Sequence, residues 1–247
     1  MSAKARIAIL QTGRNNPHLR PDQPDYPALF RDLLGKADKT ARLDMISVPV
    51  LENIFPANPA DFDGYLLTGS AAAVYEDHNW LPRLGDFVRQ AYALGKPLVG
   101  VCFGHQFLAK ALGGAAEKSA KGWGYGIRQT PLLAPPDSLP PELRAAGLSD
   151  LSLIYSHQDQ VASLPPGARL ISGDAFCPYA AFTMGDQLLS IQGHPEFTPA
   201  YADNLYEVMA DRVGRELSQQ ARASLSARND GQLMASWMVR VLLQEQV

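Results

Sequence analysis

The stretch KPLVGVCFGHQFLAK, residues 96–110, runs from a Lys-Pro turn through a short apolar strand into a helix. Cys102 lies at the junction, between Gly100 and Gly104. A cysteine inside a strand is usually a small buried hydrophobic residue, whereas one at a strand-to-helix turn can be a nucleophile. This segment alone is compatible with both interpretations, so the rest of the chain has to decide between them.

Short apolar runs and helical patterns alternate on both sides of this stretch. Strands are predicted over four segments: residues 5–10, 44–50, 62–69 and 97–102. Apolar residues at three- and four-residue spacings predict two amphipathic helices: residues 26–37 and 80–95. Such alternation is typical of an α/β fold with a parallel sheet and helices on both faces. The polar, proline-rich residues 11–27 follow the first strand, which places them at the carboxyl edge of the sheet, where ligands bind.

The pattern changes after Gly113-Gly114. Shorter β-like pieces follow: residues 122–133, 151–156, 180–184 and 187–197. The pair Gly185-Asp186 predicts a hairpin turn between the last two pieces. From Pro199 onward the pattern is helical. We therefore expect a main domain of residues 1–198, with a small antiparallel β addition, and a helical C-terminal extension of residues 199–247 packed on it.

The composition narrows the class of protein. The 247 residues carry 22 Lys and Arg against 25 Asp and Glu, a formal net charge of −3, and no run of like charge stands out. This balance argues against nucleic acid and anionic membranes as partners. Because the sequence shows no signal-peptide pattern and no apolar stretch of ~20 residues, we expect a cytoplasmic protein. In that compartment Cys102 and Cys177 are expected to be free thiols.

The residues around Cys102 form the pattern GxCxG, the thiol counterpart of the GxSxG elbow. A nucleophile on a sharp strand-to-helix turn needs neighbours without a Cβ, since the backbones approach closely there, and Gly100 and Gly104 meet that need. Backbone N–H groups at the start of the helix would also favour the thiolate. A packed core cysteine explains the motif equally well when it is taken alone.

A nucleophilic cysteine needs a base, and the segment SIQGHPEF, residues 190–197, offers one. In extended chain, residues i and i+2 point the same way, so His194 and Glu196 are predicted to share a face. The carboxylate can then orient the imidazole and stabilise the imidazolium. A solvated turn is the simpler interpretation of an isolated HPE, but its place at a strand end in a chain with GxCxG favours the catalytic one.

Together these residues resemble the class I glutamine amidotransferases, whose motifs are GxCxGxQ and, later, HPE. The resemblance covers most of residues 5–198 and implies a flavodoxin-like three-layer sandwich with a mostly parallel central sheet. It implies that Cys102 is the nucleophile, that His194 is the base and that Glu196 orients the base.

The resemblance also implies groups that surround the substrate. The segment LLTGS, residues 66–70, is similar to a loop that supplies an oxyanion-hole N–H, although alanines follow where many members have Gly-Pro. The donor is therefore Gly69 or Ser70, and Phe103 would provide a second N–H. The residues implied in substrate binding are Gln106 and, from residues 155–161, Ser156, His157 and Gln158.

Other candidate residues receive structural interpretations. Cys102 and His105 have the spacing CxxH, but no second ligand pair accompanies them, so we predict no metal and no cofactor. His105 is expected to form a structural hydrogen bond, and Cys177 is expected to be buried. The apolar residues of the last helical segment are predicted to cover the core: Leu233, Met234, Trp237, Met238, Val241 and Leu242.

These observations predict hydrolysis of the γ-glutamyl amide of glutamine or of another small γ-glutamyl compound through a cysteinyl thioester. The sequence contains no GxxxxGK[ST] nucleotide loop. It looks most like free-standing relatives of the GMP-synthase glutaminase domain, a group that includes γ-glutamyl peptide hydrolases. Two alternatives remain: an ammonia-donating subunit that needs a separate synthetase partner, and a non-catalytic binding or regulatory protein with the same fold.

Overall fold

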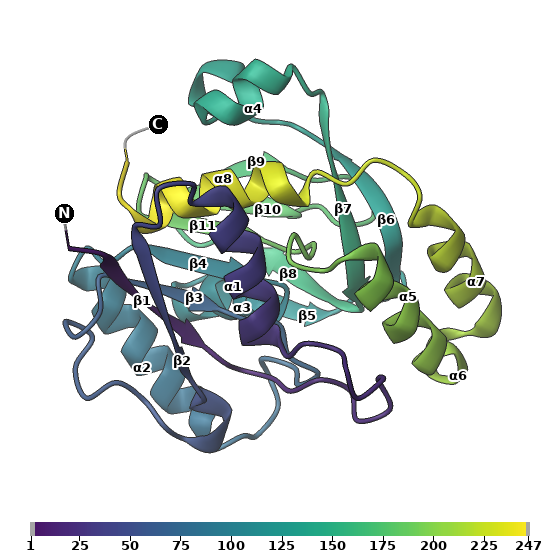
Figure 1. Ribbon diagram of the computed structural model, residues 1–247, viewed down its shortest axis with the longest axis horizontal. Helices are drawn as coiled ribbons and strands as arrows, with labels where there is room; N and C mark the ends of the chain where they lie inside the picture. The colour runs from purple at the N-terminus through teal and green to yellow at the C-terminus, as the bar shows by residue number, and fades with distance from the viewer. Residues whose placement is uncertain (1–2, 246–247) are drawn as a thin grey trace.

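A seven-stranded sheet forms the centre of the computed structural model, which describes residues 3–245. Its strands are β1 (Ala5–Leu10), β2 (Leu43–Val48), β3 (Gly64–Leu67), β4 (Leu98–Val101), β9 (Arg169–Ser172), β10 (Ala181–Met184) and β11 (Leu188–Ile191). They lie in the order β2-β1-β3-β4-β11-β10-β9 (Figure 1). All neighbours from β2 to β11 are parallel, and β10 is antiparallel to both of its neighbours. The predicted mostly parallel sheet is confirmed.

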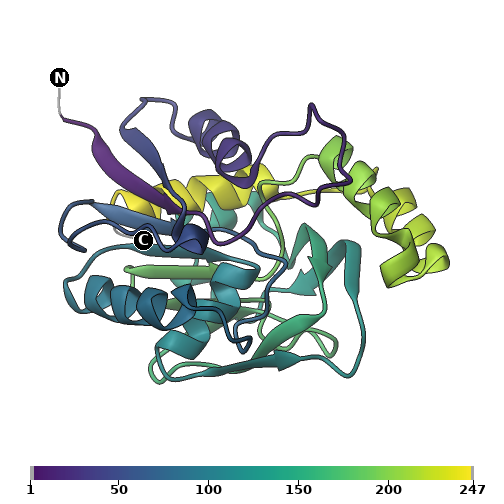
Figure 2. The same cartoon turned by 90° about the horizontal axis from the view of Figure 1, so that it is seen from below.

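Helices cover both faces of this sheet. Helices α1 (Tyr26–Ala37) and α8 (Gly231–Leu242) lie on one face, and α2 (Trp80–Ala93) and α3 (Phe103–Ala111) lie on the other (Figure 2). Side chains alternate along each strand, so Ile7 and Ile9 pack with α1 and α8, whereas Ala8 and Leu10 pack with α2 and α3. The central strands β3 and β4 are apolar throughout because both of their faces are buried. This arrangement is the expected flavodoxin-like three-layer sandwich.

Several predicted elements match the structure closely. The bounds of β1 and α1 are those predicted, and the hairpin between β10 and β11 turns at Gly185, whose φ is 56°. The predicted helical stretch after Pro199 is broken into three pieces: α5 (Pro199–Val208), α6 (Ala210–Val213) and α7 (Arg215–Ser224). Gly214 separates the last two with a φ of 109°, a conformation that other residues rarely adopt.

Helix α8 covers the core as predicted. Met234, Trp237, Met238, Val241 and Leu242 are all buried, and they share one apolar cluster with α1 and the sheet. One of the two helical layers is therefore completed by the predicted C-terminal extension. The division of the chain at residue 198 stays a prediction.

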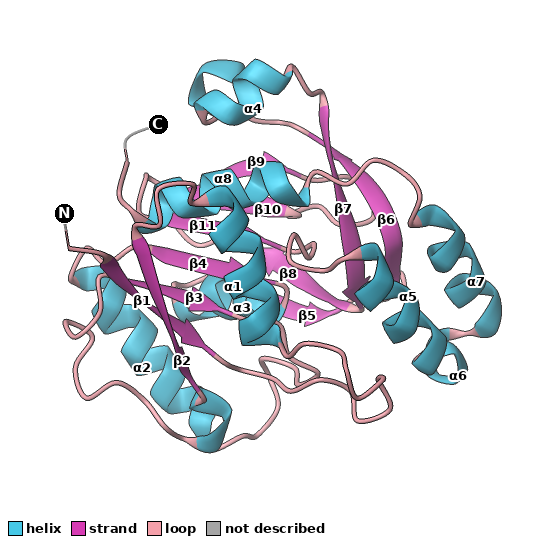
Figure 3. Cartoon of the chain, viewed as in Figure 1, coloured by secondary structure: helices cyan, strands magenta, loops and turns pink. Residues whose placement is uncertain are grey.

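Two small antiparallel pairs extend the fold beyond the carboxyl ends of the parallel strands (Figure 3). They are β5 (Ala115–Lys118) with β8 (Asp159–Ser163) and β6 (Gly124–Pro131) with β7 (Asp150–His157). Three short helices lie in the connections: η1 (Val50–Glu52), η2 (Pro136–Ser138) and α4 (Pro141–Ala146). Helix α7 packs on β6, and α5 packs on α7. The two strand pairs and helices α5 to α7 together form a shoulder, a group of elements beside the central sheet. Among residues 3–245, no helix has the length and hydropathy needed to cross a bilayer.

The loop after β1 is tied to the helices of this shoulder. Tyr201 donates its hydroxyl hydrogen to Asn15 Oδ1 (3.0 Å), and the Asn16 side-chain amide donates to the Met209 sulfur (3.2 Å). The backbone N–H of Arg20 donates to Asn204 Oδ1 (2.9 Å). Segments from the two ends of the chain are thereby brought together at the carboxyl edge of the sheet.

Candidate active site

Cys102 occupies a strained turn between β4 and α3. Its φ is 53° and its ψ is −104°, a conformation that is uncommon for a residue with a side chain and that often marks a functional site. A Cβ on Gly100 would lie 2.6 Å from the Gly104 carbonyl oxygen, and one on Gly104 would lie 2.4 Å from the Leu67 carbonyl oxygen. The close backbone approach predicted for the two glycines is confirmed, and it holds the Cys102 side chain at the end of the sheet.

His194 follows β11 and is anchored by the neighbouring strand β7. Its backbone N–H donates to the Ile154 carbonyl oxygen at 2.7 Å. A Cβ on Gly193 would lie 2.8 Å from the Leu153 side chain, so glycine permits this close approach. The predicted extended path is wrong at residues 195–196, which form a bend. The side chains nevertheless meet, because His194 Nδ1 lies 2.8 Å from Glu196 Oε1.

The hydrogen bond of the Glu196 carboxylate is to His194. The Glu196 side chain is fully buried, and Oε2 has no hydrogen-bond donor within the described part of the chain. Burial by itself would lower the pKa of His194, but the negative charge of Glu196 and the sulfur of Cys102 raise that pKa to about 10. At neutral pH the imidazole therefore holds a proton beside the Cys102 sulfur.

The ring of Phe197 stacks on the face of the His194 imidazole. The two ring centroids are 3.9 Å apart, and the planes are inclined by only 5°. Phe197 also contacts the ring of Tyr201, with centroids 4.6 Å apart. The sequence analysis missed this role. The only available signal was an aromatic residue directly after the HPE motif.

The raised pKa of His194 predicts how stability depends on pH. An imidazole whose folded pKa exceeds its ordinary value of 6.5 stabilises the fold fully below pH 6.5, and that contribution disappears as the pH rises through about 10. Since Glu196 provides much of this effect, wild type should exceed Glu196→Gln in unfolding free energy by a margin that shrinks from pH 6.5 to 10. Urea unfolding of both proteins at pH 6.5, 8 and 10 measures it, and a constant or growing margin would contradict the assigned ion pair.

Three backbone N–H groups near Cys102 are available to a ligand. Within residues 3–245, the N–H groups of Gly69, Ser70 and Phe103 have no protein acceptor. Phe103 begins α3, where the first N–H groups of a helix normally lack intrahelical partners. Gly69 lies beside both side chains, since a Cβ placed on it would be 3.2 Å from His194 Cε1 and 3.9 Å from Cys102 Cβ. All three stay candidates for an oxyanion hole.

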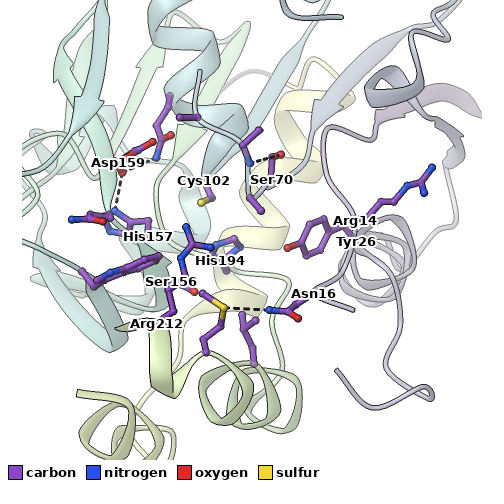
Figure 4. A pocket seen from close by; sticks show the side chains of 18 of the residues that line it. Arg14, Asn16, Tyr26, Ser70, Cys102, Ser156, His157, Asp159, His194 and Arg212 are labelled. Carbon is purple, nitrogen blue, oxygen red and sulfur yellow. Dashed lines mark hydrogen bonds between the residues drawn. The ribbon is translucent and has the colours of Figure 1, made fainter. Parts of the chain in front are cut away.

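A pocket of about 430 Å³ lies at the carboxyl ends of the parallel strands, and Cys102 and His194 both line it (Figure 4). This volume suits a small-molecule ligand. The predicted substrate residues all line it too: Gln106, Ser156, His157 and Gln158. The pocket lining therefore includes Cys102, His194, Ser70 and the predicted substrate residues, while Glu196 lies behind His194.

Two of these residues are themselves held by the protein. Gln106 Nε2 and His157 Nδ1 both donate to the Asp159 carbonyl oxygen, at 2.7 and 3.0 Å. Burial lowers the pKa of His157 to about 3, so this imidazole is neutral at pH 7. The amide nitrogen of Gln106 is thus already in use, which leaves its amide oxygen for a ligand.

Other lining residues come from segments that no motif marked. Arg14, Asn15, Asn16, Pro17 and Tyr26 belong to the polar segment predicted at the ligand edge, and that prediction is confirmed. Asp159 belongs to the predicted substrate segment, residues 155–161. The sequence analysis missed the others: Ala71, Ala72, Ala73, Tyr75, Glu76, Lys118, Trp123, Phe197, Leu205, Met209 and Arg212. They reach the pocket through the chain's path in space, which no local pattern reveals.

His105 and Cys177 have the buried positions predicted for them. His105 is buried, and its Nδ1 lies 2.7 Å from the Ser190 hydroxyl. Burial lowers the pKa of His105 to about 3 and keeps its imidazole neutral. Cys177 is buried, and it and Cys102 are free thiols. Among residues 3–245, no group of three or more His, Cys, Asp or Glu side chains is arranged to hold a metal ion.

Comparison with known proteins gives one family and several relatives. The family model "Glutamine amidotransferase class-I" matches residues 34–208. Gamma-glutamyl peptidase 3 of Arabidopsis thaliana is 29% identical over 220 residues, which is 88% of this chain and 86% of that protein. The GMP synthase of Alteromonas mediterranea is 36% identical over 153 residues, or 60% of this chain and 27% of that protein. A glutamine amido transferase structure from Methylobacillus flagellatus superposes with a TM-score of 0.74 at 20% identity, covering 100% of this chain and 96% of that one.

Proposed function

The chain belongs to the class I glutamine amidotransferase family, and from this premise we propose that it hydrolyses γ-glutamyl amide bonds through a thioester on Cys102. One observation carries the proposal. A cysteine on a strained strand-to-helix turn lies in the same pocket as a buried, carboxylate-bound histidine whose raised pKa keeps it protonated.

In the first half of the reaction the Cys102 sulfur, as a thiolate whose proton is held by His194, attacks the side-chain carbonyl carbon of the γ-glutamyl group. The carbonyl oxygen becomes an oxyanion, which the N–H of Phe103 and that of Gly69 or Ser70 would stabilise, each such donor contributing roughly 10²–10³ in rate. His194 gives its proton to the departing nitrogen, and the amine leaves. The glutamyl group is then held as a thioester.

In the second half, His194, now neutral, takes a proton from water as the water oxygen attacks the thioester carbonyl. The tetrahedral intermediate collapses, glutamate leaves, and the Cys102 sulfur and His194 return to their starting states. General acid–base help of this kind contributes roughly 10²–10⁴ in rate. Glu196 stabilises the imidazolium at both ends of the cycle and sets the ring orientation through Nδ1.

We propose that the leaving group is the amine of an amino acid or peptide, so that γ-glutamyl peptides are substrates alongside glutamine. The similarity to gamma-glutamyl peptidase 3 supports this substrate class, since it extends over 88% of this chain and 86% of that protein. A pocket of about 430 Å³ also has room for more than a glutamyl side chain.

The purified chain should turn over γ-glutamylglycine at least as efficiently as glutamine. The physical reason is preorganisation, because His194 already lies in the pocket with Glu196 bonded to it, and the three candidate N–H donors have no protein acceptor within residues 3–245. Steady-state kcat/KM for both substrates measures it. Glutamine preferred strongly over every γ-glutamyl dipeptide would contradict the peptide assignment.

A second candidate function is ammonia donation to a separate synthetase. The similarity to the GMP synthase of Alteromonas mediterranea favours it, since 153 residues of this chain match part of that larger protein. In this case the isolated chain would be slow with both substrates until the synthetase is added. Specific binding of a γ-glutamyl compound without any turnover, with or without a synthetase, would instead support a non-catalytic binding protein.

A further inference from the structure

Arg212 is a cation in the pocket wall without an anion of its own. It belongs to α6 and lines the same pocket as Cys102 and His194. Within residues 3–245, no carboxylate lies within ion-pair distance of its guanidinium and no hydrogen bond occupies that group. The guanidinium lies over the ring of Trp123, whose centroid is 5.5 Å from the guanidinium carbon. Such stacking restricts the arginine rotamers while leaving all the N–H donors available.

Arg14, the other arginine that lines the pocket, differs from Arg212 in its ion pairing and in the direction of its side chain. Arg14 forms an ion pair with Glu52, and its side chain points away from Cys102 (Figure 4). Arg212 lies on the side of the pocket shared with Ser156 and His157 in the same view. Of the two arginines, only Arg212 presents an uncommitted guanidinium to a ligand.

The wall that carries Arg212 is held in place. Arg222 of α7 binds the Asp203 carboxylate of α5 with two hydrogen bonds, at 2.7 and 3.1 Å. Met209, at the start of α6, accepts the bond from Asn16. Arg212 lies outside residues 34–208, the part of the chain that matches the family model.

The positive charge of Arg212 reaches into the pocket. Burial raises the pKa of Asp159, and the hydroxyl of Tyr75 together with the charges of Lys118 and Arg212 opposes that rise. A substrate in this pocket therefore meets a guanidinium whose field is not cancelled by a direct ion pair.

We propose that Arg212, held by Trp123, binds a carboxylate of the substrate. This inference rests on the proposed function and names which group of the substrate this side of the pocket recognises. A planar guanidinium matches a carboxylate with two parallel hydrogen bonds. Two carboxylates of a γ-glutamyl peptide qualify, the α-carboxylate of the glutamyl group and the carboxylate of the departing amino acid.

The test compares Arg212→Ala with wild type on two substrates, γ-glutamylglycine, which carries both carboxylates, and γ-glutamyl-p-nitroanilide, which lacks the one on the leaving group. Loss of a charge-assisted pair should raise KM for γ-glutamylglycine by roughly 10- to 100-fold with a smaller change in kcat. A similar rise for the anilide assigns the α-carboxylate, and a rise confined to the dipeptide assigns the leaving group. Arg212→Lys should recover part of the loss.

Arg215 provides the matched control. It lies three residues further on, pairs with Asp211 and is absent from the pocket lining, so Arg215→Ala should leave KM unchanged. Unchanged KM for both substrates in Arg212→Ala, or an equal loss in Arg215→Ala, would overturn the inference.

A binding measurement separates this inference from the proposed function. Calorimetry with γ-glutamylglycine on Cys102→Ala, with and without Arg212→Ala, requires no turnover. An affinity that falls roughly 10- to 100-fold on loss of Arg212 supports the carboxylate site even if the wild-type chain proves inactive. Equal affinities, or no binding to Cys102→Ala, would overturn it even if wild type is an active hydrolase.

Discussion

Replacing Cys102 with alanine is expected to reduce turnover of γ-glutamyl substrates by roughly 10⁴-fold or more. The variant removes the atom that would form the thioester, and the neutral His157 across the pocket offers no comparable nucleophile. The fold should survive, because alanine at position 102 has the same backbone and Cβ as cysteine and can adopt the same strained turn. Gly100 and Gly104, which permit the close backbone approach, are unchanged. Steady-state kinetics on γ-glutamylglycine measure the loss.

Cys177→Ala is the matched control, since Cys177 is the other free thiol and lies outside the pocket. Burial and the nearby Asp174 carboxylate raise the pKa of Cys177 to about 12, so it stays an unreactive thiol. A chloroketone analogue of glutamine should accordingly label Cys102 and spare Cys177. Peptide mapping that finds equal labelling, or near-normal turnover by Cys102→Ala, would remove the nucleophile assignment.

Replacing His194 with alanine should reduce turnover about as much as loss of Cys102, whereas Glu196→Gln should leave a measurable remnant. His194 transfers protons in both halves of the proposed reaction, while Glu196 acts only through the imidazole. The amide in Glu196→Gln keeps an oxygen that can accept from Nδ1 but loses the charge that raises the pKa of His194. Members of a catalytic unit contribute unequally and without additivity.

The ratio of kcat values for the two variants, measured on one substrate, decides this prediction, and circular dichroism checks that both fold. The pH dependence of kcat/KM should also shift in Glu196→Gln, toward a lower pKa for the general acid. Near-normal activity of His194→Ala would mean that another group is the base. His157 would be the first to test, although its lowered pKa makes it a weak base and its Nδ1–H already donates to the Asp159 carbonyl oxygen.

Local sequence patterns predicted the helices and strands in which burial follows a regular repeat from residue to residue. The strand at residues 5–10 and the helix at residues 26–37 have the predicted bounds because one is buried on both faces and the other packs with a regular apolar stripe. The elbow at Cys102 was also predictable, since its two glycines are required by contacts within residues 100–104 and with the adjacent strand.

Other features depend on contacts between distant segments and leave no such pattern. Phe197 stacks on His194 only because the chain bends at residues 195–196, where an extended path was expected. Arg212 lines the pocket from α6, a short helix that periodicity does not separate from its neighbours. Long-range packing of this kind overrides local preference and becomes visible only in the folded chain.

The position of β11 beside β4 has a consequence for synthesis on the ribosome. β4 and Cys102 are made long before β11, yet the Cys102 N–H donates to the Ile191 carbonyl oxygen, at 2.9 Å, and His194 follows directly. A nascent chain therefore carries the cysteine with one side of its strand unpaired until residues near 191 emerge from the exit tunnel. Folding of the centre of the sheet must wait for this late strand, as is usual for pairings between distant segments. Cys102 and His194 consequently come together only after residue 194 has left the ribosome, so shorter nascent chains carry the thiol without the imidazole beside it.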